Sequence, residues 1–151
     1  MNRLLRSGFA ALAITASGSP SLAQSFKFQA HDEEATVASG LGAAGQPVLG
    51  QMVTGSSVSQ TEGEPSIAGR HKCASLFNVA ADQMYKIHMI CEVTASSGDF
   101  VIVAGCNPGA KATVTCLGEV TGKSGQYAGR RGLVTIYTAD KSVSGVGQWL
   151  K

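Results

Sequence analysis

The chain has 151 residues, of which 44% are apolar and 15% are charged, and its formal net charge is +2. This length suits one domain with a single core, and the apolar content excludes a wholly disordered chain. The small net charge excludes the strongly basic surface by which many proteins bind nucleic acids, so we expect no nucleic-acid partner. Glycine is unusually common, with 19 residues, well above its usual share of about 7%.

The N-terminus has the three-part layout of a cleaved secretory signal peptide, predicted to span residues 1–23. Arg3 and Arg6 precede a short apolar run, and Ser21-Leu22-Ala23 has the small-x-small form of a cleavage site. Because a membrane-spanning helix needs about 20 apolar residues, and no run is that long, we expect no integral membrane span. We therefore predict export, to the periplasm or the medium, of one domain over residues 24–151.

The rest of the chain predicts short strands, and no ten-residue stretch keeps a helical period. In Tyr85–Val93, apolar residues alternate with Lys86, His88 and Glu92, which is typical of an antiparallel strand with one buried face. Further strands are predicted at Ser25–Ala30, Val48–Val53, Ser56–Gln60, Cys73–Val79, Phe100–Ala104, Lys111–Cys116, Arg131–Thr138 and Ser142–Leu150.

This pattern predicts an all-β fold, either an antiparallel closed barrel of about eight strands or a sandwich. A closed barrel has the advantage that it leaves no edge strand exposed in an exported protein. The stretch Gly40–Gly69 contains seven glycines and two prolines. We expect this stretch to hold loops, bends or bulges more than regular structure.

Four cysteines, Cys73, Cys91, Cys106 and Cys116, lie in the exported part, where disulfides are the default expectation. A zinc site is the alternative, but the sequence has no C-x-x-C pair. When the chain is folded at its predicted turns, the four cysteines lie side by side on four consecutive strands. Strands about 4.8 Å apart allow disulfides only between neighbours. Cys73–Cys91 with Cys106–Cys116 is the connectivity that pairs neighbours throughout, so we predict no free thiol, metal or cofactor.

Three segments carry a family resemblance. Gly122–Gly132 resembles the GTGKYAGITGSG run of small exported bacterial proteins that are similar to the allene oxide cyclase and dirigent barrels. Cys91–Phe100 resembles their C-x-x-T-D-A-D-G-D segment, with Ala95 and Ser97 in place of two aspartates, and Gly145–Trp149 resembles their closing G-x-G-x-W strand. The resemblance implies an eight-stranded antiparallel barrel, related in shape to the lipocalins, that can hold an apolar ligand. It implies no activity, because the catalytic carboxylate of plant allene oxide cyclases has no counterpart here.

Six residues are candidates for contacts with a ligand or with the barrel rim. They are Tyr85, His88, Glu92, Arg130, Arg131 and Trp149. His88 and Glu92 line the barrel if its lumen is polar, and they belong to the outer surface if the lumen is apolar. Arg130 and Arg131 are adjacent, so on a strand they point to opposite faces, and one of them is placed to contact an anion.

The leading functional hypothesis is a non-catalytic module that binds a small apolar or amphipathic molecule. A second hypothesis is an isomerase or cyclase in which the shape of the lumen selects the product; a lumen without a buried ionisable pair would argue against it. A third is protein binding or enzyme inhibition through glycine-rich loops. It rests on Ser124-Gly125-Gln126-Tyr127, which is similar to the Ser-Gly-x-x-Tyr loop of periplasmic lysozyme inhibitors but one residue shorter in spacing.

Overall fold

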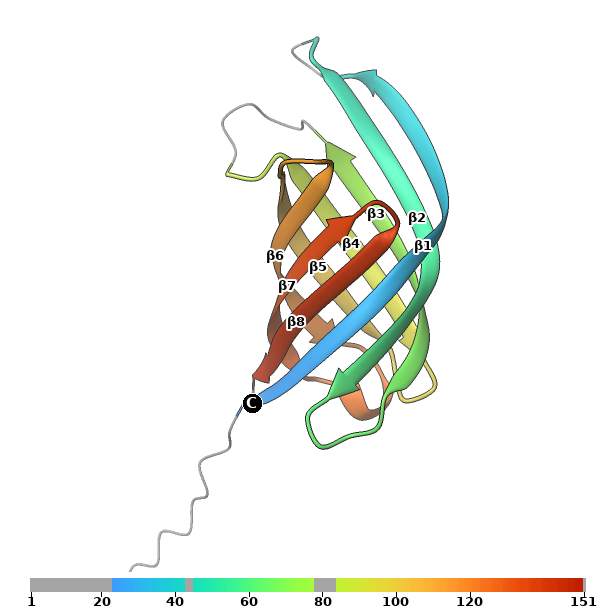
Figure 1. Cartoon of the computed structure of the whole chain (residues 1–151), viewed down its shortest axis with the longest axis vertical. Helices are drawn as coiled ribbons and strands as arrows, with labels where there is room; N and C mark the ends of the chain where they lie inside the picture. The colour runs from blue at the N-terminus through green and yellow to red at the C-terminus, as the bar shows by residue number, and fades with distance from the viewer. Residues whose placement is uncertain (1–22, 43–44, 78–83, 151) are drawn as a thin grey trace, which may run out of the picture.

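The structure, a computed structural model, is a closed barrel of eight antiparallel strands that follow one another in chain order (Figure 1). It describes residues 23–42, 45–77 and 84–150, so almost all of the predicted signal peptide lies outside the described residues. The strands are β1 (Gln24–Leu41), β2 (Pro47–Thr61), β3 (Ile67–Phe77), β4 (Ile87–Ala95), β5 (Phe100–Pro108), β6 (Thr113–Gly122), β7 (Arg131–Ala139) and β8 (Ser142–Leu150), with a 3-10 turn, η1 (Gly125–Tyr127), before β7. The predicted all-β closed barrel of about eight strands is confirmed.

Alternation along the strands builds the core, because successive side chains of a strand point to opposite faces of the sheet. On β5, Phe100, Ile102 and Ala104 point inward and are buried, whereas Val103 is exposed on the outer wall. On β4, the same period buries Ile87, Cys91 and Val93 and leaves His88, Ile90 and Glu92 outside. The lumen is therefore lined by the apolar faces of these strands.

The glycine-rich stretch differs from the prediction, because residues 47–61 form one continuous strand, β2. Its glycines lie inside the strand and do not interrupt it. A Cβ at Gly50 would make only ordinary van der Waals contacts, whereas a Cβ at Gly55 would overlap the carbonyl oxygen of His31 and the ring of His71. Gly55 is thus a place where another strand and a side chain approach closely, which is a common role of glycine within sheets.

The hairpin of β1 and β2 is longer than the rest of the barrel wall. β1 pairs with β2 along most of its length but with β8 only over Gln24–His31. A register shift between Asp32 and Glu34 leaves Glu33 as an extra residue in a β-bulge, and bulges bend a strand. Beyond the bulge, the hairpin extends past the neighbouring turns at one end of the barrel (Figure 1).

Two disulfides join neighbouring strands directly across from each other. Cys73–Cys91 links β3 to β4, and Cys106–Cys116 links β5 to β6. Cys91, Cys106 and Cys116 are buried in the lumen. The predicted connectivity is confirmed, because each pair lies in register in its hairpin.

An aromatic cluster closes the other end of the barrel. The Trp149 ring stacks on Tyr127 with centroids 5.4 Å apart, and it also contacts Phe26 at 5.3 Å and Phe100 at 6.1 Å. Tyr127 belongs to η1, and the connection between β6 and β7 places η1 across this end of the barrel. The guanidinium of Arg130 lies 4.9 Å from the centre of the Trp149 ring. We call these five residues the floor of the barrel.

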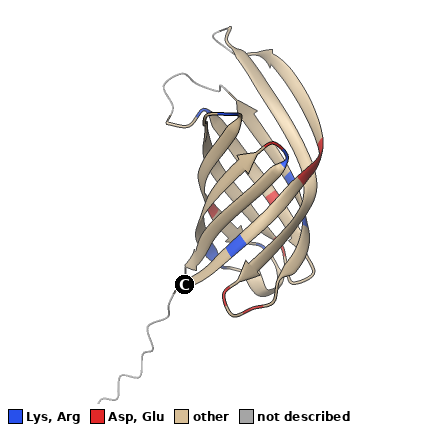
Figure 2. Ribbon diagram, in the orientation of Figure 1, with Lys and Arg blue, Asp and Glu red and all other residues tan. Residues whose placement is uncertain are grey.

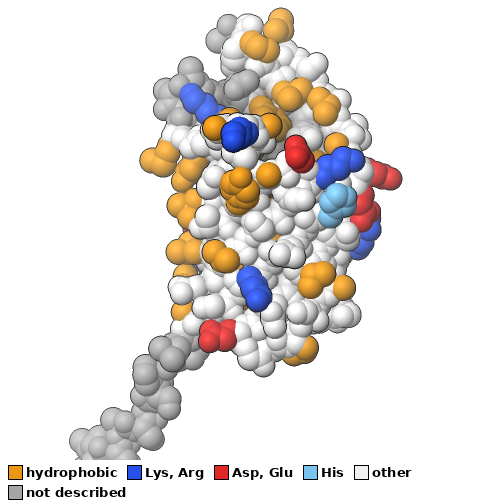
Figure 3. Space-filling view, in the orientation of Figure 1, with side chains coloured by type: hydrophobic (Ala, Val, Ile, Leu, Met, Phe, Trp, Pro, Cys, Tyr) orange, Lys and Arg blue, Asp and Glu red, His pale blue; other side chains and the backbone are white. Residues whose placement is uncertain are grey.

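The outer wall carries few charges and several exposed apolar side chains. Charged residues lie mainly in turns, near strand ends and around the bulge of β1 (Figure 2). Leu117, Leu133 and Val146, on β6, β7 and β8, are each at least half exposed, and apolar patches are spread over the face shown in Figure 3. The outer faces of these strands therefore mix exposed apolar side chains with mainly uncharged polar ones.

Candidate functional site

The lumen holds a cavity of about 270 Å³ between the floor and the open end. Its wall combines aromatic and aliphatic side chains such as Phe28, Phe77 and Ile136 with both disulfides. At the open end it reaches Ala112 in the β5–β6 turn and Asp140 in the β7–β8 turn. An apolar cavity of 150 Å³ in a protein core is known to admit benzene, so a space of this size suits a small organic molecule.

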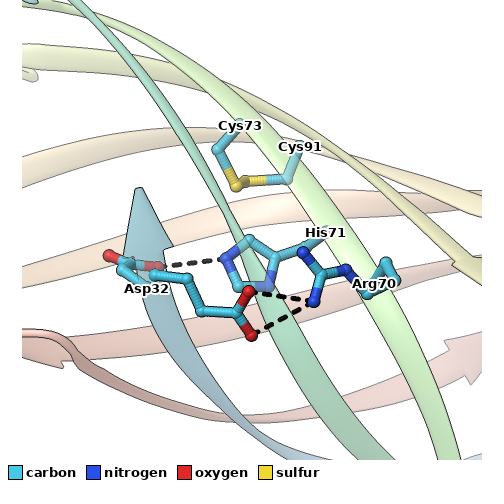
Figure 4. Close-up of polar contacts among 6 residues, drawn as sticks. Asp32, Arg70, His71, Cys73 and Cys91 are labelled. Atoms are coloured by element: carbon cyan, nitrogen blue, oxygen red, sulfur yellow. Dashed lines mark hydrogen bonds and ion pairs between the residues drawn. A yellow bond between two sulfur atoms is a disulfide. The ribbon is translucent and has the colours of Figure 1, made fainter. Parts of the chain in front are cut away.

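A polar pair interrupts the apolar wall. Asp32, Gly55 and His71 are register partners on three neighbouring strands, β1, β2 and β3. The imidazole of His71 reaches past Gly55, and its Nε2 lies 3.0 Å from Oδ1 of Asp32 (Figure 4). Both side chains line the cavity. The His71 side chain is only 5% exposed, and that of Asp32 is 25% exposed at the upper wall.

The hydrogen bond defines how the pair is protonated. An ionised carboxylate only accepts hydrogen bonds, so Nε2 of His71 carries the proton that it donates to Asp32. In the neutral ring, Nδ1 then holds a lone pair, and this atom is buried without a hydrogen-bond partner. A buried polar atom left unpaired costs about 1–3 kcal/mol. The pair is therefore retained at some cost to stability, which is typical of functional positions.

A salt bridge on the outer face of the barrel lies next to the Asp32–His71 pair. On this face Arg70 of β3 approaches Glu33 of the bulge, with Nη1 2.9 Å from Oε2 (Figure 4). Hydrogen bonds from Ser56 and Arg70 hold the pKa of Glu33 below its usual value. A lowered carboxyl pKa stabilises the fold at neutral pH, and this contribution is lost as the pH falls through the folded-state pKa. The bridge is exposed, so its contribution is small.

We predict that Gly55→Ala destabilises the barrel by about 1–3 kcal/mol, because the new methyl group overlaps the main chain of β1 and the His71 ring. Gly50→Ala is the matched control on the same strand, since the nearest atom to a Cβ there is 3.7 Å away. Because alanine suits a strand better than glycine, Gly50→Ala should leave stability unchanged or raise it slightly. Urea denaturation of both variants tests this expectation, and equal effects would contradict it.

The residues predicted to contact a ligand lie elsewhere. Tyr85 precedes β4, and its ring covers Gly105 on the outer wall, so it does not share the inner face with Ile87. His88 and Glu92 are on the outer surface of β4. Glu92 forms an ion pair with Lys123 at 2.5 Å, which links β4 to the loop before η1.

The remaining predicted contacts lie at or below the floor. Arg130 and Trp149 are part of the floor, and Arg131 is exposed at the start of β7. Among the described residues, the cavity lining includes none of the six candidates. Their roles as ligand or rim contacts stay predictions.

Sequence reasoning missed Asp32 and His71, although the alternation contained a signal for both. His71 lies two residues before Cys73 and so shares its face of β3. Asp32 continues the inward series Phe28, Ala30 on β1. The sequence interpretation ended the first strand at Ala30 and placed His71 before a strand, so neither residue was assigned to the lumen.

The ionisable groups among the described lining residues of the cavity are two carboxyl groups and one imidazole. Asp32 and Asp140 line it, and none of its lining residues in the described part of the chain is a lysine or arginine. Within residues 23–42, 45–77 and 84–150, no three His, Cys, Asp or Glu side chains are grouped closely enough to hold a metal ion. The described residues also include no helix long and apolar enough to cross a membrane.

No protein-family model matches the chain, and a comparison with curated proteins finds no similar sequence.

Proposed function

We propose that the barrel is a binding module that takes a small apolar or amphipathic molecule into its lumen. The observation that supports this most directly is the cavity of about 270 Å³, closed by the floor and walled mainly by apolar side chains. Transfer of apolar groups from water into such a space is favourable by roughly 0.8 kcal/mol per CH₂ group. The resemblance to allene oxide cyclase and dirigent barrels agrees with a ligand-holding barrel and stays a prediction.

A variant that fills the cavity tests this function. Ala30 lines the cavity on β1, so Ala30→Phe places a ring inside it. We expect the wild-type protein to bind 1-octanol with a dissociation constant on the order of 0.1 mM, a value reached by ligands of this size in apolar sites. Ala30→Phe should weaken this binding at least tenfold, as measured by isothermal titration calorimetry.

The matched control is Ala68→Phe, because Ala68 is exposed on the outer face of β3. This variant adds the same ring outside the lumen and should bind 1-octanol like the wild type. Far-UV circular dichroism verifies that both variants keep the barrel. Failure of the wild-type protein to bind 1-octanol, or equal affinities of the two variants, would refute a binding lumen.

The Asp32–His71 pair favours a second candidate, an isomerase that moves a proton within a bound substrate. A histidine oriented by a carboxylate is a common general base, and here Nδ1 is its unprotonated nitrogen. Against this candidate, Nδ1 is covered by protein atoms. The two candidates differ in their effect on the exchange of the α-protons of 2-octanone with deuterium oxide, which NMR follows. An isomerase would raise this exchange rate above its value in buffer, whereas a binding module leaves the rate unchanged.

We also propose that the domain reaches an oxidising compartment, the periplasm or the medium, after removal of residues 1–23. The two disulfides support this, because disulfides are rare in proteins that stay in a reducing cytoplasm. N-terminal sequencing of the exported protein tests the cleavage site, and an N-terminus other than Gln24 would contradict it.

A further inference from the structure

The ionised groups around the cavity have one sign. Asp32 lies in the upper wall and Asp140 at the rim, and the described lining residues include no lysine or arginine. Lys111 and Lys141 lie in the two turns at this end, but both are exposed and neither is among the lining residues. Water and salt screen such exposed charges strongly, so they compensate poorly for a carboxylate inside the wall.

The arrangement leaves one oxygen of Asp32 for a ligand. Oδ1 accepts the hydrogen bond from His71, whereas Oδ2 makes no hydrogen bond in the described structure. His71 is more than nine-tenths buried and lines the same cavity, but its unpartnered Nδ1 is covered by protein atoms, so Oδ2 of Asp32 is the acceptor that a ligand can reach. A ligand that fills this part of the cavity must therefore bring a hydrogen-bond donor to Oδ2.

We propose that the lumen selects amphipathic molecules with a cationic head group, such as a primary alkylammonium, and rejects alkyl carboxylates. The alkyl chain lies among the apolar side chains toward the floor, and the ammonium donates a charge-assisted hydrogen bond to Oδ2 of Asp32. A carboxylate in the same place would face Asp32 without a compensating cation and would repel it. The Asp32–His71 hydrogen bond holds the acceptor in position. This inference rests on the proposed binding function and specifies the chemical class of the ligand.

Three probes with the same eight-carbon chain test the selection: octylammonium, 1-octanol and octanoate, measured by calorimetry at neutral pH below their aggregation concentrations. We expect octylammonium to bind at least tenfold more tightly than octanoate, with 1-octanol between them. Asp32→Asn keeps an oxygen that accepts from His71 but removes the charge. It should reduce the preference for octylammonium over octanoate to threefold or less.

Glu119→Gln is the matched control, because Glu119 is exposed on the outer face of β6 and its replacement changes the net charge equally. It should leave the tenfold preference unchanged. The affinity of Asp32→Asn for 1-octanol serves as its folding check, since this neutral probe needs the intact lumen. If Asp32→Asn also loses its affinity for 1-octanol, Asp32→Ser is measured in its place. We expect Asp32→Ser to lose the preference for octylammonium over octanoate in the same way.

The outcomes separate this inference from the function on which it rests. If 1-octanol binds but octanoate binds as tightly as octylammonium, the binding function stands and the cation selection is wrong. The selection is also wrong if Asp32→Asn keeps the full preference, because another group must then carry it. If none of the three probes binds the wild-type protein, the proposed function itself is wrong.

Discussion

Replacement of Trp149 by alanine is expected to lower the free energy of unfolding by about 3–5 kcal/mol, the usual cost of removing a large buried aromatic side chain. Trp149 is only 2% exposed, and its ring contacts Phe26, Phe100 and Tyr127. These residues belong to β8, β1, β5 and η1, so one side chain joins segments from both ends of the chain. Its removal leaves a hole in the floor that the rigid strand ladders cannot fill.

Urea denaturation followed by far-UV circular dichroism measures this loss, because the variant lacks the only tryptophan of the chain. The control is Tyr137→Ala on β7, where the aromatic side chain is 48% exposed on the outer wall. An exposed residue without such contacts should change stability by no more than about 0.5 kcal/mol. A similar loss in both variants would mean that the aromatic floor is not a centre of stability.

The middle of the barrel was predictable from the sequence because its strands are short, regular and separated by clear turns. From Ile87 to Cys116, alternation identified the buried face, and the disulfide partners followed from symmetry about the turns. Tyr85 is the exception. The strand begins at Ile87, so the alternation that included Tyr85 had already ended, and its ring packs on the outside over Gly105.

The long hairpin of β1 and β2 was less predictable, and the reason is physical. Gly50 and Gly55 carry no side chain to continue an alternating pattern, and the bulge at Glu33 shifts the pattern of β1 by one residue. Local sequence therefore gives no period across either strand. The pairing of β2 with β1 and β3, which supplies its hydrogen bonds on both sides, overrides the weak preference of these glycines for strands.

The Asp32–His71 pair illustrates the limit for the site. Each residue has a local signal that it points inward, but their meeting depends on the register of three strands and on the missing side chain at Gly55. The two residues are 39 positions apart in sequence. Register between strands so far apart is fixed by the closed barrel, so the site could be assembled only from the structure.

Removal of both disulfides, by Cys73→Ala with Cys91→Ala and Cys106→Ala with Cys116→Ala, is expected to produce the largest loss of stability. In the chain-entropy account, a disulfide stabilises a fold because it restricts the unfolded chain, and loops of 18 and 10 residues give about 3 kcal/mol each. The combined loss of about 6 kcal/mol lies within the 5–15 kcal/mol that holds a typical domain together. The fourfold variant should therefore be largely unfolded at physiological temperature.

Fluorescence of Trp149 measures this loss, since the single tryptophan is buried in the floor and becomes exposed on unfolding. Each two-residue variant should lose about half as much stability as the fourfold variant, because the pairs close separate hairpins and contribute independently. Wild-type protein treated with dithiothreitol supplies the control without any substitution and should match the fourfold variant. A reduced protein as stable as the oxidised one would contradict this account and would remove the dependence on an oxidising compartment. The expected result ties the fold to an oxidising environment, because a barrel that needs both disulfides becomes stable only where they can form.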